Sequence, residues 1–342
     1  MMGAGHDACS IPPPASRASG GEGGERSEPG GGLAGNQRSV ISDQRPTDIL
    51  ITVSWPLIPV HPPPLTPPRH SLRKWGEGNP HTVRHSAFFA AAAFFIIVCC
   101  LNALAAEIPQ NDRRSGTAFM TRETQAMQED DRANPGMLAV LDGEALWNDA
   151  PPGAKSCAGC HGDASTSMKG VAARYPAFDE ARGRPIDLEQ RINLCRTEHQ
   201  HAPPLGWETR ELNALTAYVA NQSRGMPITA GTDERSRPFV EAGRALFNRR
   251  QGQLDLSCAQ CHDDNWGKRL AGSTIPQAHP TGYPEYRLEW QSIGSLQRRL
   301  RSCTFGVRAE PLAYGAPEQV DLELYLMWRA RGMPLETPAV RP

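Results

Sequence analysis

Two eight-residue stretches of the chain share one pattern of reactive side chains. Residues 156–163 read SCAGCHGD and residues 257–264 read SCAQCHDD, so each contains Cys-x-x-Cys-His. Two thiols three positions apart can form thioether bonds with the two vinyl groups of one haem, and the adjacent histidine can bind its iron. The pattern predicts two covalently bound haem c groups, attached and ligated by Cys157, Cys160 and His161 and by Cys258, Cys261 and His262.

Two other kinds of site use a Cys-x-x-Cys pair. A structural zinc site needs further ligands at matching spacing, and a redox-active dithiol does not need an adjacent histidine in two copies. We therefore favour haem over both alternatives.

The composition sets residues 1–85 apart from the rest of the chain, and the net charge argues against a nucleic acid partner. The 342 residues carry a formal charge of −1, which gives no reason to expect a nucleic acid partner. Residues 1–85 are crowded with Pro, Gly, Ser and Arg. Such a segment cannot bury enough apolar surface to offset its chain entropy. We interpret residues 1–85 as a low-complexity extension.

A signal peptide is expected after this extension. Residues 87–101 are an apolar run that is short for a membrane span, and the small-x-small sequence Ala-Leu-Ala follows at 103–105. This pattern predicts a signal peptide over residues 86–105 and a mature chain that begins near Ala106. A transmembrane anchor is the alternative, but we expect no permanent anchor.

The position of the signal peptide has a consequence for the start of translation. Because a signal peptide begins near the N-terminus of the translated chain, we expect translation to begin near Val83, so that residues 1–85 would be largely untranslated. Export predicts a periplasmic protein, which agrees with haem c because its attachment takes place outside the cytoplasm.

The mature chain contains a tandem duplication. Four segments recur in the same order, 100 to 108 residues apart, and the polar sequence at 229–238 is the natural linker. Apolar residues at helical spacing occur in both copies, and no run of five or more residues alternates as a strand. The prediction is a mostly α fold of two tandem cytochrome c-like domains, at residues 106–230 and 231–342.

The sixth ligand of each haem iron has several candidates. Methionine is the usual choice in small electron carriers, but each RGMP sequence follows the expected last helix of its domain, whereas the ligand loop of that fold precedes it. Cys195 and Cys303 occupy equivalent places between the haem motif and the last helix. We favour these two cysteines from a set that comprises Met226, Met333, His199, His201, His279, Cys195 and Cys303.

A disulfide between Cys195 and Cys303 is the structural alternative. An oxidising compartment would permit it, but duplicated units usually repeat an internal role. Thiolate ligation would lower the haem potential relative to Met/His ligation. Two haems of low potential favour chemistry at a cysteine over general electron transfer.

A basic run precedes Cys303. The sequence LQRRLRSC places Arg299 four residues before the cysteine, on the same face if the helix continues. A guanidinium favours a neighbouring thiolate and matches oxyanions in a bidentate manner. Contact with a haem propionate is an equal alternative, because Arg191 precedes Cys195 in the same way. Arg298 and Arg301 have no counterparts in the first copy, which makes the second copy more favourable for anions.

This combination of motifs resembles the SoxA family, the dihaem subunits of the SoxAX cytochromes in bacterial thiosulfate oxidation. The resemblance covers roughly residues 130–342. It implies an L-cysteine S-thiosulfotransferase that couples thiosulfate oxidatively to a cysteine of a SoxYZ-like sulfur carrier and passes electrons to haem. It also implies that Cys303 is an active-site persulfide as well as a haem ligand, that Arg299 contacts the substrate, and that the partner is a SoxX-like monohaem cytochrome.

Three other functions are alternatives to this one. A dihaem electron carrier without sulfur chemistry would use Met or His ligands and unmodified cysteines. A dihaem peroxidase would need an open iron site and a catalytic base, which the repeated cysteine does not fit. A haem or redox sensor would need an output segment, and none follows the second copy.

Overall fold

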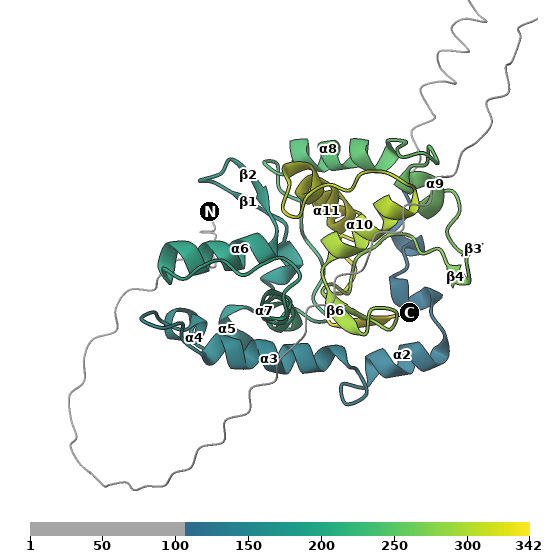
Figure 1. Ribbon diagram of the computed structural model, residues 1–342. Coiled ribbons are helices and arrows are strands. Elements are labelled where there is room, and N and C mark those ends of the chain that lie inside the picture. The colour runs from purple at the N-terminus through teal and green to yellow at the C-terminus, as the bar shows by residue number, and fades with distance from the viewer. Residues whose placement is uncertain (1–106) are drawn as a thin grey trace, which may run out of the picture. The chain divides into compact units, whose positions relative to one another are not determined.

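The computed structural model describes residues 107–342, and the expected extension and signal peptide lie outside the described residues. The chain is mostly helical, as predicted, with strands of at most three residues (Figure 1). The first copy of the repeated unit contains α3 (Gly136–Asn148), α4 (Cys157–His161), α5 (Ala164–Ser167), η3 (Ala172–Arg174), β1 (Ala177–Asp179), β2 (Arg184–Ile186), α6 (Leu188–Leu194), η4 (Cys195–His199) and α7 (Arg210–Asn221).

The second copy repeats the order of long helix, haem-motif helix, hairpin, helix and closing helix, without counterparts of α5, η3 and η4. It adds a short hairpin of β3 (Arg269–Leu270) and β4 (Ser273–Thr274), and a C-terminal strand, β7 (Ala339–Arg341), which lies parallel to β5 (Glu285–Arg287). Its elements are α8 (Arg237–Asn248), α9 (Cys258–His262), β3 (Arg269–Leu270), β4 (Ser273–Thr274), β5 (Glu285–Arg287), β6 (Ser292–Gly294), α10 (Leu296–Gly306), α11 (Pro317–Arg329) and β7 (Ala339–Arg341).

One pair of long helices forms the frame of each copy. α3 packs on α7, and α8 packs on α11. A glycine lies at each crossing: a Cβ atom on Gly143 would be 2.1 Å from the carbonyl oxygen of Ala214, and one on Gly243 would be 2.0 Å from that of Asp321. The two main chains therefore approach more closely than any larger residue allows.

A hairpin leads into the next helix of each copy. The pairs β1–β2 and β5–β6 have the same register, with Asp179 opposite Arg184 and Arg287 opposite Ser292. The hairpin is followed at once by an N-cap residue, Asp187 for α6 and Ser295 for α10. The equal register places residue 179 of the first copy and residue 287 of the second at equivalent positions.

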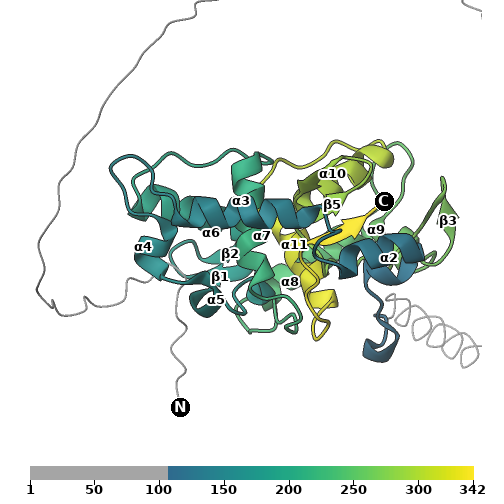
Figure 2. The ribbon, with the colours of Figure 1, turned by 90° about the horizontal axis from the view of Figure 1, so that it is seen from below.

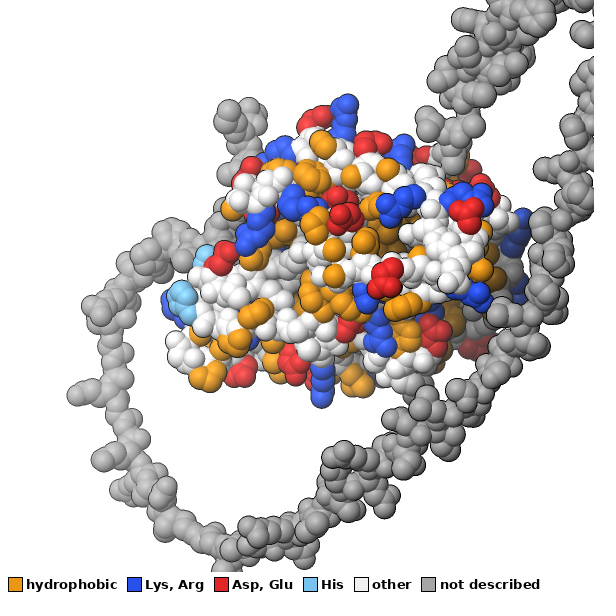
Figure 3. Space-filling view, turned by 45° about the horizontal axis from the view of Figure 1, so that its top comes forward, with side chains coloured by type: hydrophobic (Ala, Val, Ile, Leu, Met, Phe, Trp, Pro, Cys, Tyr) orange, Lys and Arg blue, Asp and Glu red, His pale blue; other side chains and the backbone are white. Residues whose placement is uncertain are grey.

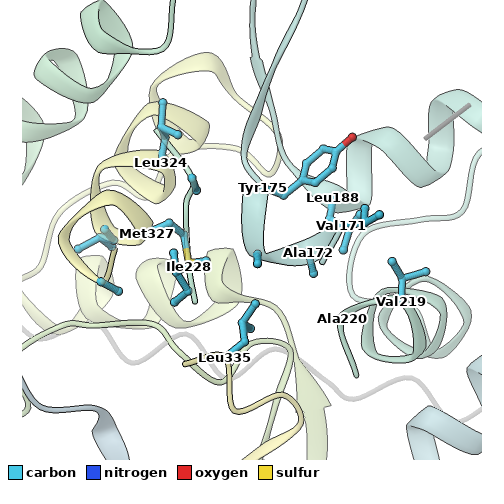
Figure 4. Packing of buried hydrophobic residues seen from close by; sticks show 14 of the residues in the cluster. Val171, Ala172, Tyr175, Leu188, Val219, Ala220, Ile228, Leu324, Met327 and Leu335 are labelled. Atoms are coloured by element: carbon cyan, nitrogen blue, oxygen red, sulfur yellow. The ribbon is translucent and has the colours of Figure 1, made fainter. Parts of the chain in front are cut away.

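The two copies share one core. Figure 4 shows side chains of both copies gathered in one region, among them Tyr175 and Val219 from the first and Leu324 and Met327 from the second. Main-chain hydrogen bonds also join the two RGMP sequences, where Pro227 and Pro334 form an antiparallel bridge. The duplicated units therefore fold against each other.

The N-terminal part of the described chain lies against the second copy. This part contains η1 (Gln110–Asp112), η2 (Gly116–Phe119) and α2 (Arg122–Glu129), and α2 packs on β7 (Figure 2). The main-chain N–H of Arg114 donates to Gln277 Oε1 at 2.7 Å, and Asn134 Nδ2 donates to the Pro338 carbonyl at 2.8 Å. Residues 107–134, which the sequence analysis assigned to the first domain, thus contribute to the second.

Acidic and basic side chains are intermixed over the face of the molecule that Figure 3 displays. Within residues 107–342, none of the helices combines the length and the apolar character that a membrane span requires.

Candidate haem and sulfur site

The two Cys-x-x-Cys-His motifs form short helices because each begins with a serine cap. The Ser156 hydroxyl accepts a hydrogen bond from the Gly159 N–H at 2.9 Å, and the Ser257 hydroxyl accepts one from the Gln260 N–H at 3.3 Å. Helical geometry places residues i and i+3 on one face, so the two thiols of each motif point to the same side. All four of these cysteines are free thiols.

The histidine of the second motif is oriented as an iron ligand would be. His262 Nδ1 lies 2.7 Å from the Pro276 carbonyl oxygen, so Nδ1 carries the proton and the lone pair of Nε2 is available. Burial lowers the pKa of His262, which keeps the imidazole neutral. His161 also has a pKa lowered by burial, and its ring lies 5.6 Å from that of Trp147.

The second copy contains a cavity that fits a haem. Its volume is about 550 Å³, and His262, Arg299 and Cys303 all line it. This volume lies in the range of pockets that take a large organic cofactor. The donors of this copy, the two thiols of α9, the neutral imidazole of His262 and Cys303, are those of a cysteine-ligated haem c, and of these His262 and Cys303 line the cavity.

The first copy has the same kinds of donor but much less space. Cys157, His161, Arg191 and Cys195 line a cavity of about 50 Å³. The amide of Gln200 donates to Cys157 Sγ at 3.8 Å, and burial raises the pKa of that thiol. The donor set fits a haem, but these side chains must move apart before one can enter.

The two remaining cysteines are not bonded to each other. Cys303 is an exposed free thiol on α10. Cys195, at the start of the π-helical turn η4, is disulfide-bonded, and Cys303 cannot be its partner. The alternative of a Cys195–Cys303 disulfide is therefore wrong.

Most other candidates for the sixth ligand lie away from both cavities. Met226 and Met333 lie in the RGMP sequences, where the Met226 carbonyl accepts from the Leu335 N–H at 3.0 Å and the Met333 carbonyl from the Ile228 N–H at 2.9 Å. Among the described residues that line the two cavities, neither methionine occurs.

The three histidine candidates are divided by the structure. His199 and His201 are exposed on the surface. His279 is buried in the wall of the second cavity, with Nδ1 2.9 Å from the Arg114 carbonyl oxygen, and burial lowers its pKa to about 4. At the offset that relates Cys195 to Cys303, His279 corresponds to Val171, so this histidine has no counterpart in the first copy and only the cavity reveals its place.

One arginine of the basic run reaches the second cavity. α10 runs without interruption from Leu296 to Gly306, so Arg299 and Cys303 are one turn apart on one face, as the sequence analysis expected. Burial would lower the pKa of Arg299, but Cys303 and Tyr283 raise it.

The other two arginines of the run point elsewhere. Arg298 lies over the ring of Trp290 at 4.1 Å, and Arg301 lies over Tyr314 and donates to the Leu312 carbonyl. Neither Arg298 nor Arg301 is among the described residues that line the second cavity. The additional cations that line the cavity are ones the sequence analysis did not select: Arg269, Arg287 and Arg341.

Both copies of the repeated unit match one known protein family. The model described as SoxA/TsdA, cytochrome c domain, matches residues 142–228 and 242–335, one Cys-x-x-Cys-His motif in each. The chain belongs to the SoxA/TsdA cytochrome c family. The two matches confirm the tandem cytochrome c-like domains, and membership in this family implies haem c.

Individual members of the SoxA/TsdA family support this assignment. The L-cysteine S-thiosulfotransferase subunit SoxA of Pseudaminobacter salicylatoxidans is 40% identical over 235 residues, covering 68% of this chain and 82% of the relative. The subunit of the same name from Rhodovulum sulfidophilum is 39% identical over 230 residues, covering 67% and 80%. A solved structure, SoxXA from P. pantotrophus, matches with a TM-score of 0.65 and 33% identity over 67% of this chain and 87% of that chain.

Proposed function

We propose that this chain is a dihaem c-type cytochrome that couples thiosulfate oxidatively to a cysteine of a SoxYZ-like carrier protein, as an L-cysteine S-thiosulfotransferase. The observation that carries the proposal is the second cavity, where an exposed free cysteine, a guanidinium one turn before it and a neutral imidazole line one space of about 550 Å³. The names of the relatives support the same activity.

The proposed reaction joins two sulfur atoms. A thiol of the carrier and one thiosulfate ion give a carrier S–S–SO₃⁻ group, one proton and two electrons. The S–S bond is formed by oxidation, so an electron acceptor is needed. When bound, haem c supplies this acceptor by taking up single electrons.

The haem ligands are assigned by their positions in the two copies. Cys258 and Cys261 would attach the second haem, and His262 and Cys303 would bind its iron. Cys157, Cys160, His161 and Cys195 would serve the first haem in the same order. Ligation by Cys195 and the disulfide at this residue exclude each other, so the thiol state of Cys195 in the haem-loaded chain tests this assignment.

Cys303 and Arg299 would carry the sulfur chemistry. Cys303 is exposed, so a flexible segment of a carrier can reach its sulfur, and we assign it the role of a persulfide that carries the transferred sulfur. Arg299 lies on the same helical face and would hold the thiosulfate oxygens, for which a planar guanidinium is well suited.

The partners and location follow from the same proposal. The solved neighbour is a SoxXA complex, which supports a heterodimer with a SoxX-like monohaem cytochrome that takes electrons onward. Export by the signal peptide at residues 86–105 would place the mature chain in the periplasm, where it would meet thiosulfate and the carrier.

Mass spectrometry of the purified complex tests the proposal. We expect two haems per chain and one additional sulfur atom, removable by cyanide, on the peptide that contains Cys303. The variant Cys303→Ser should retain both haems but lose coupling of thiosulfate to carrier by at least a hundredfold. Cys195→Ser should change the spectrum of one haem and retain more activity.

The rival function gives a different outcome in these experiments. A dihaem electron carrier would contain an unmodified Cys303 and would pass electrons in the Cys303→Ser variant at the normal rate. Coupling of thiosulfate at the normal rate by Cys303→Ser would disprove the assignment of this residue.

A further inference from the structure

Two equivalent arginines, one in each copy, have different hydrogen-bond and ion-pair partners. Arg191 and Arg299 each precede the favoured cysteine by four residues, and each lines the cavity of its own copy. In the first copy, Arg191 Nε donates to the Tyr175 hydroxyl at 3.1 Å and an Nη donates to Asp179 Oδ2 at 2.5 Å. Two donors of Arg191, Nε and one Nη, are thus engaged by the protein itself.

Asp179 is held in place to receive this guanidinium. Its other carboxylate oxygen accepts from the Arg182 N–H at 2.9 Å. Burial would raise the pKa of Asp179, but the Arg182 N–H and the charge of Arg191 lower it, so the carboxylate stays ionised. The Arg191–Asp179 pair is well buried, with side chains only 15% and 7% exposed.

The equivalent position in the second copy carries the opposite charge. Residue 287, which the hairpin register matches to residue 179, is an arginine. Arg287 pairs with Glu285 at 3.1 Å and with Glu289 at 2.9 Å. The closest carboxylate oxygen to Arg299 in the described chain is Oε1 of Glu289, at 3.7 Å. Arg299 shares this oxygen with Arg287, which lies closer to it, at 2.9 Å.

Arg299 is left with donors for a ligand. Within residues 107–342, its guanidinium makes that one long ion pair, and its side chain is 36% exposed against 15% for Arg191. A buried charged pair is much stronger than an exposed contact of this length. The two arginines occupy equivalent positions, but Arg299 has more guanidinium donors available to bind an anion than Arg191 has.

We propose that Asp179 is a specificity-determining residue that keeps the first copy from binding thiosulfate, and that its replacement by Arg287 leaves the second copy competent. This inference rests on the proposed function of Arg299. It implies that one substitution on a hairpin, outside both haem motifs, divides the roles of two duplicated sites.

Counting bound thiosulfate tests the inference. We would use equilibrium dialysis of the haem-loaded complex with radiolabelled thiosulfate, with no carrier present. The wild type should bind one ion per chain at Arg299, and Asp179→Asn should bind two, because the amide is isosteric but cannot neutralise Arg191. Asp179→Asn combined with Arg191→Gln should return to one.

A matched control separates the loss of the Asp179–Arg191 ion pair, which we call the clamp, from a general change in charge. Glu180 lies next to Asp179, is largely exposed and pairs with Arg235 instead of Arg191. Glu180→Gln removes the same charge from the same hairpin and should still bind one ion.

The reverse change provides a second measurement. Arg287→Asp should weaken thiosulfate binding at least tenfold more than Arg287→Asn, because only the aspartate can clamp Arg299. Equal weakening by both Arg287 variants would overturn the inference, and so would the same number of bound ions for Asp179→Asn and the wild type.

The outcomes distinguish the inference from the proposed function. If the wild type binds no thiosulfate but Asp179→Asn binds one ion, the clamp is correct and the proposed role of Arg299 is wrong. If neither binds any, both are wrong.

Discussion

Arg299 and Cys303 belong to one turn of α10, so the anion-binding group and the sulfur that we assign to chemistry move as one rigid unit. This geometry depends on the helix continuing through Cys303. In the first copy, α6 ends at Leu194 and the turn that contains Cys195 is π-helical. The sulfur of that copy is therefore presented by a different backbone.

Replacement of Arg299 should affect thiosulfate more than haem. We expect Arg299→Gln to lower kcat/KM for thiosulfate at least tenfold, chiefly through KM, because a charge-assisted hydrogen bond contributes about 1.5–3 kcal/mol. Steady-state kinetics with the carrier in excess would measure this.

Arg298 offers the matched control for Arg299. Its guanidinium stacks on Trp290 and does not line the cavity, so Arg298→Gln should leave kcat/KM within about threefold. If the two variants lose activity equally, the cationic run acts as a whole and Arg299 has no special role.

At this scale the sequence predicted the reactive groups but not their surroundings. The haem motifs and the shared helical face of Arg299 and Cys303 follow from local spacing. The clamp on Arg191 does not, because Asp179 is twelve residues away and reaches it only through the hairpin. The directions of Arg298 and Arg301 depend on aromatic rings brought in by tertiary packing.

The helix pairs set the framework that holds both cavities. Gly243 and Phe247 are four residues apart on one face of α8, and both are buried on this helix, which packs on α11. The sequence did not show that a glycine had to lie at each crossing, because that need arises from a helix more than sixty residues away.

Substitution of the crossing glycines should destabilise the fold. Gly143→Ala and Gly243→Ala would each place a methyl group about 2 Å from a carbonyl oxygen of the partner helix, so the helices must separate. We expect each variant to lose about 1–3 kcal/mol or more of the free energy of unfolding, as overpacking of a core does. Chemical denaturation of the haem-loaded chain would measure it.

Gly306 provides the comparison within the same chain. It lies at the end of α10, and an added Cβ would meet nothing within 4 Å. Gly306→Ala should therefore be neutral or slightly stabilising. A similar loss in all three variants would mean that backbone freedom, and not close approach, explains the glycines.

Across the whole described chain, acidic groups are buried where the two copies meet. The amide of Gln297 in the second copy donates to Asp187 at 2.7 Å and to Glu323 at 3.2 Å. Burial raises the pKa of Asp187 to about 7, and it raises that of Glu323, with a further contribution from Asp187. Glu189 is raised in the same way. No pattern in the sequence predicts this cluster, since its members come from both copies.

The cluster makes stability depend on pH. A carboxyl whose pKa is raised on folding binds its proton more tightly in the folded state, so the stability that it contributes is present at low pH and is lost as the pH rises from about 4 to about 7. We expect the free energy of unfolding to fall less steeply with pH in Asp187→Asn than in the wild type, by up to about 1.4 kcal/mol per pH unit. The asparagine can still cap α6, because Asp187 accepts from the Gln190 N–H and Asn is an equally good cap.

Unfolding free energies at pH 5 and pH 8 test this expectation. Between pH 5 and pH 8, the free energy of unfolding should fall more for the wild type than for Asp187→Asn. Parallel profiles for the two proteins would exclude Asp187 as a source of the dependence.

The pairing of the two RGMP sequences has an evolutionary consequence. Four main-chain hydrogen bonds join them in two equivalent sets: Gly225 N–H to Leu335 and Leu335 N–H to Met226, then Gly332 N–H to Ile228 and Ile228 N–H to Met333. Exchange of the copies maps one set onto the other, which is the pattern of a two-fold axis. Two separate molecules of a single-unit ancestor could form the same bonds as a symmetric homodimer. Gene duplication and fusion would then have joined two existing partners, and only afterwards could their sites diverge.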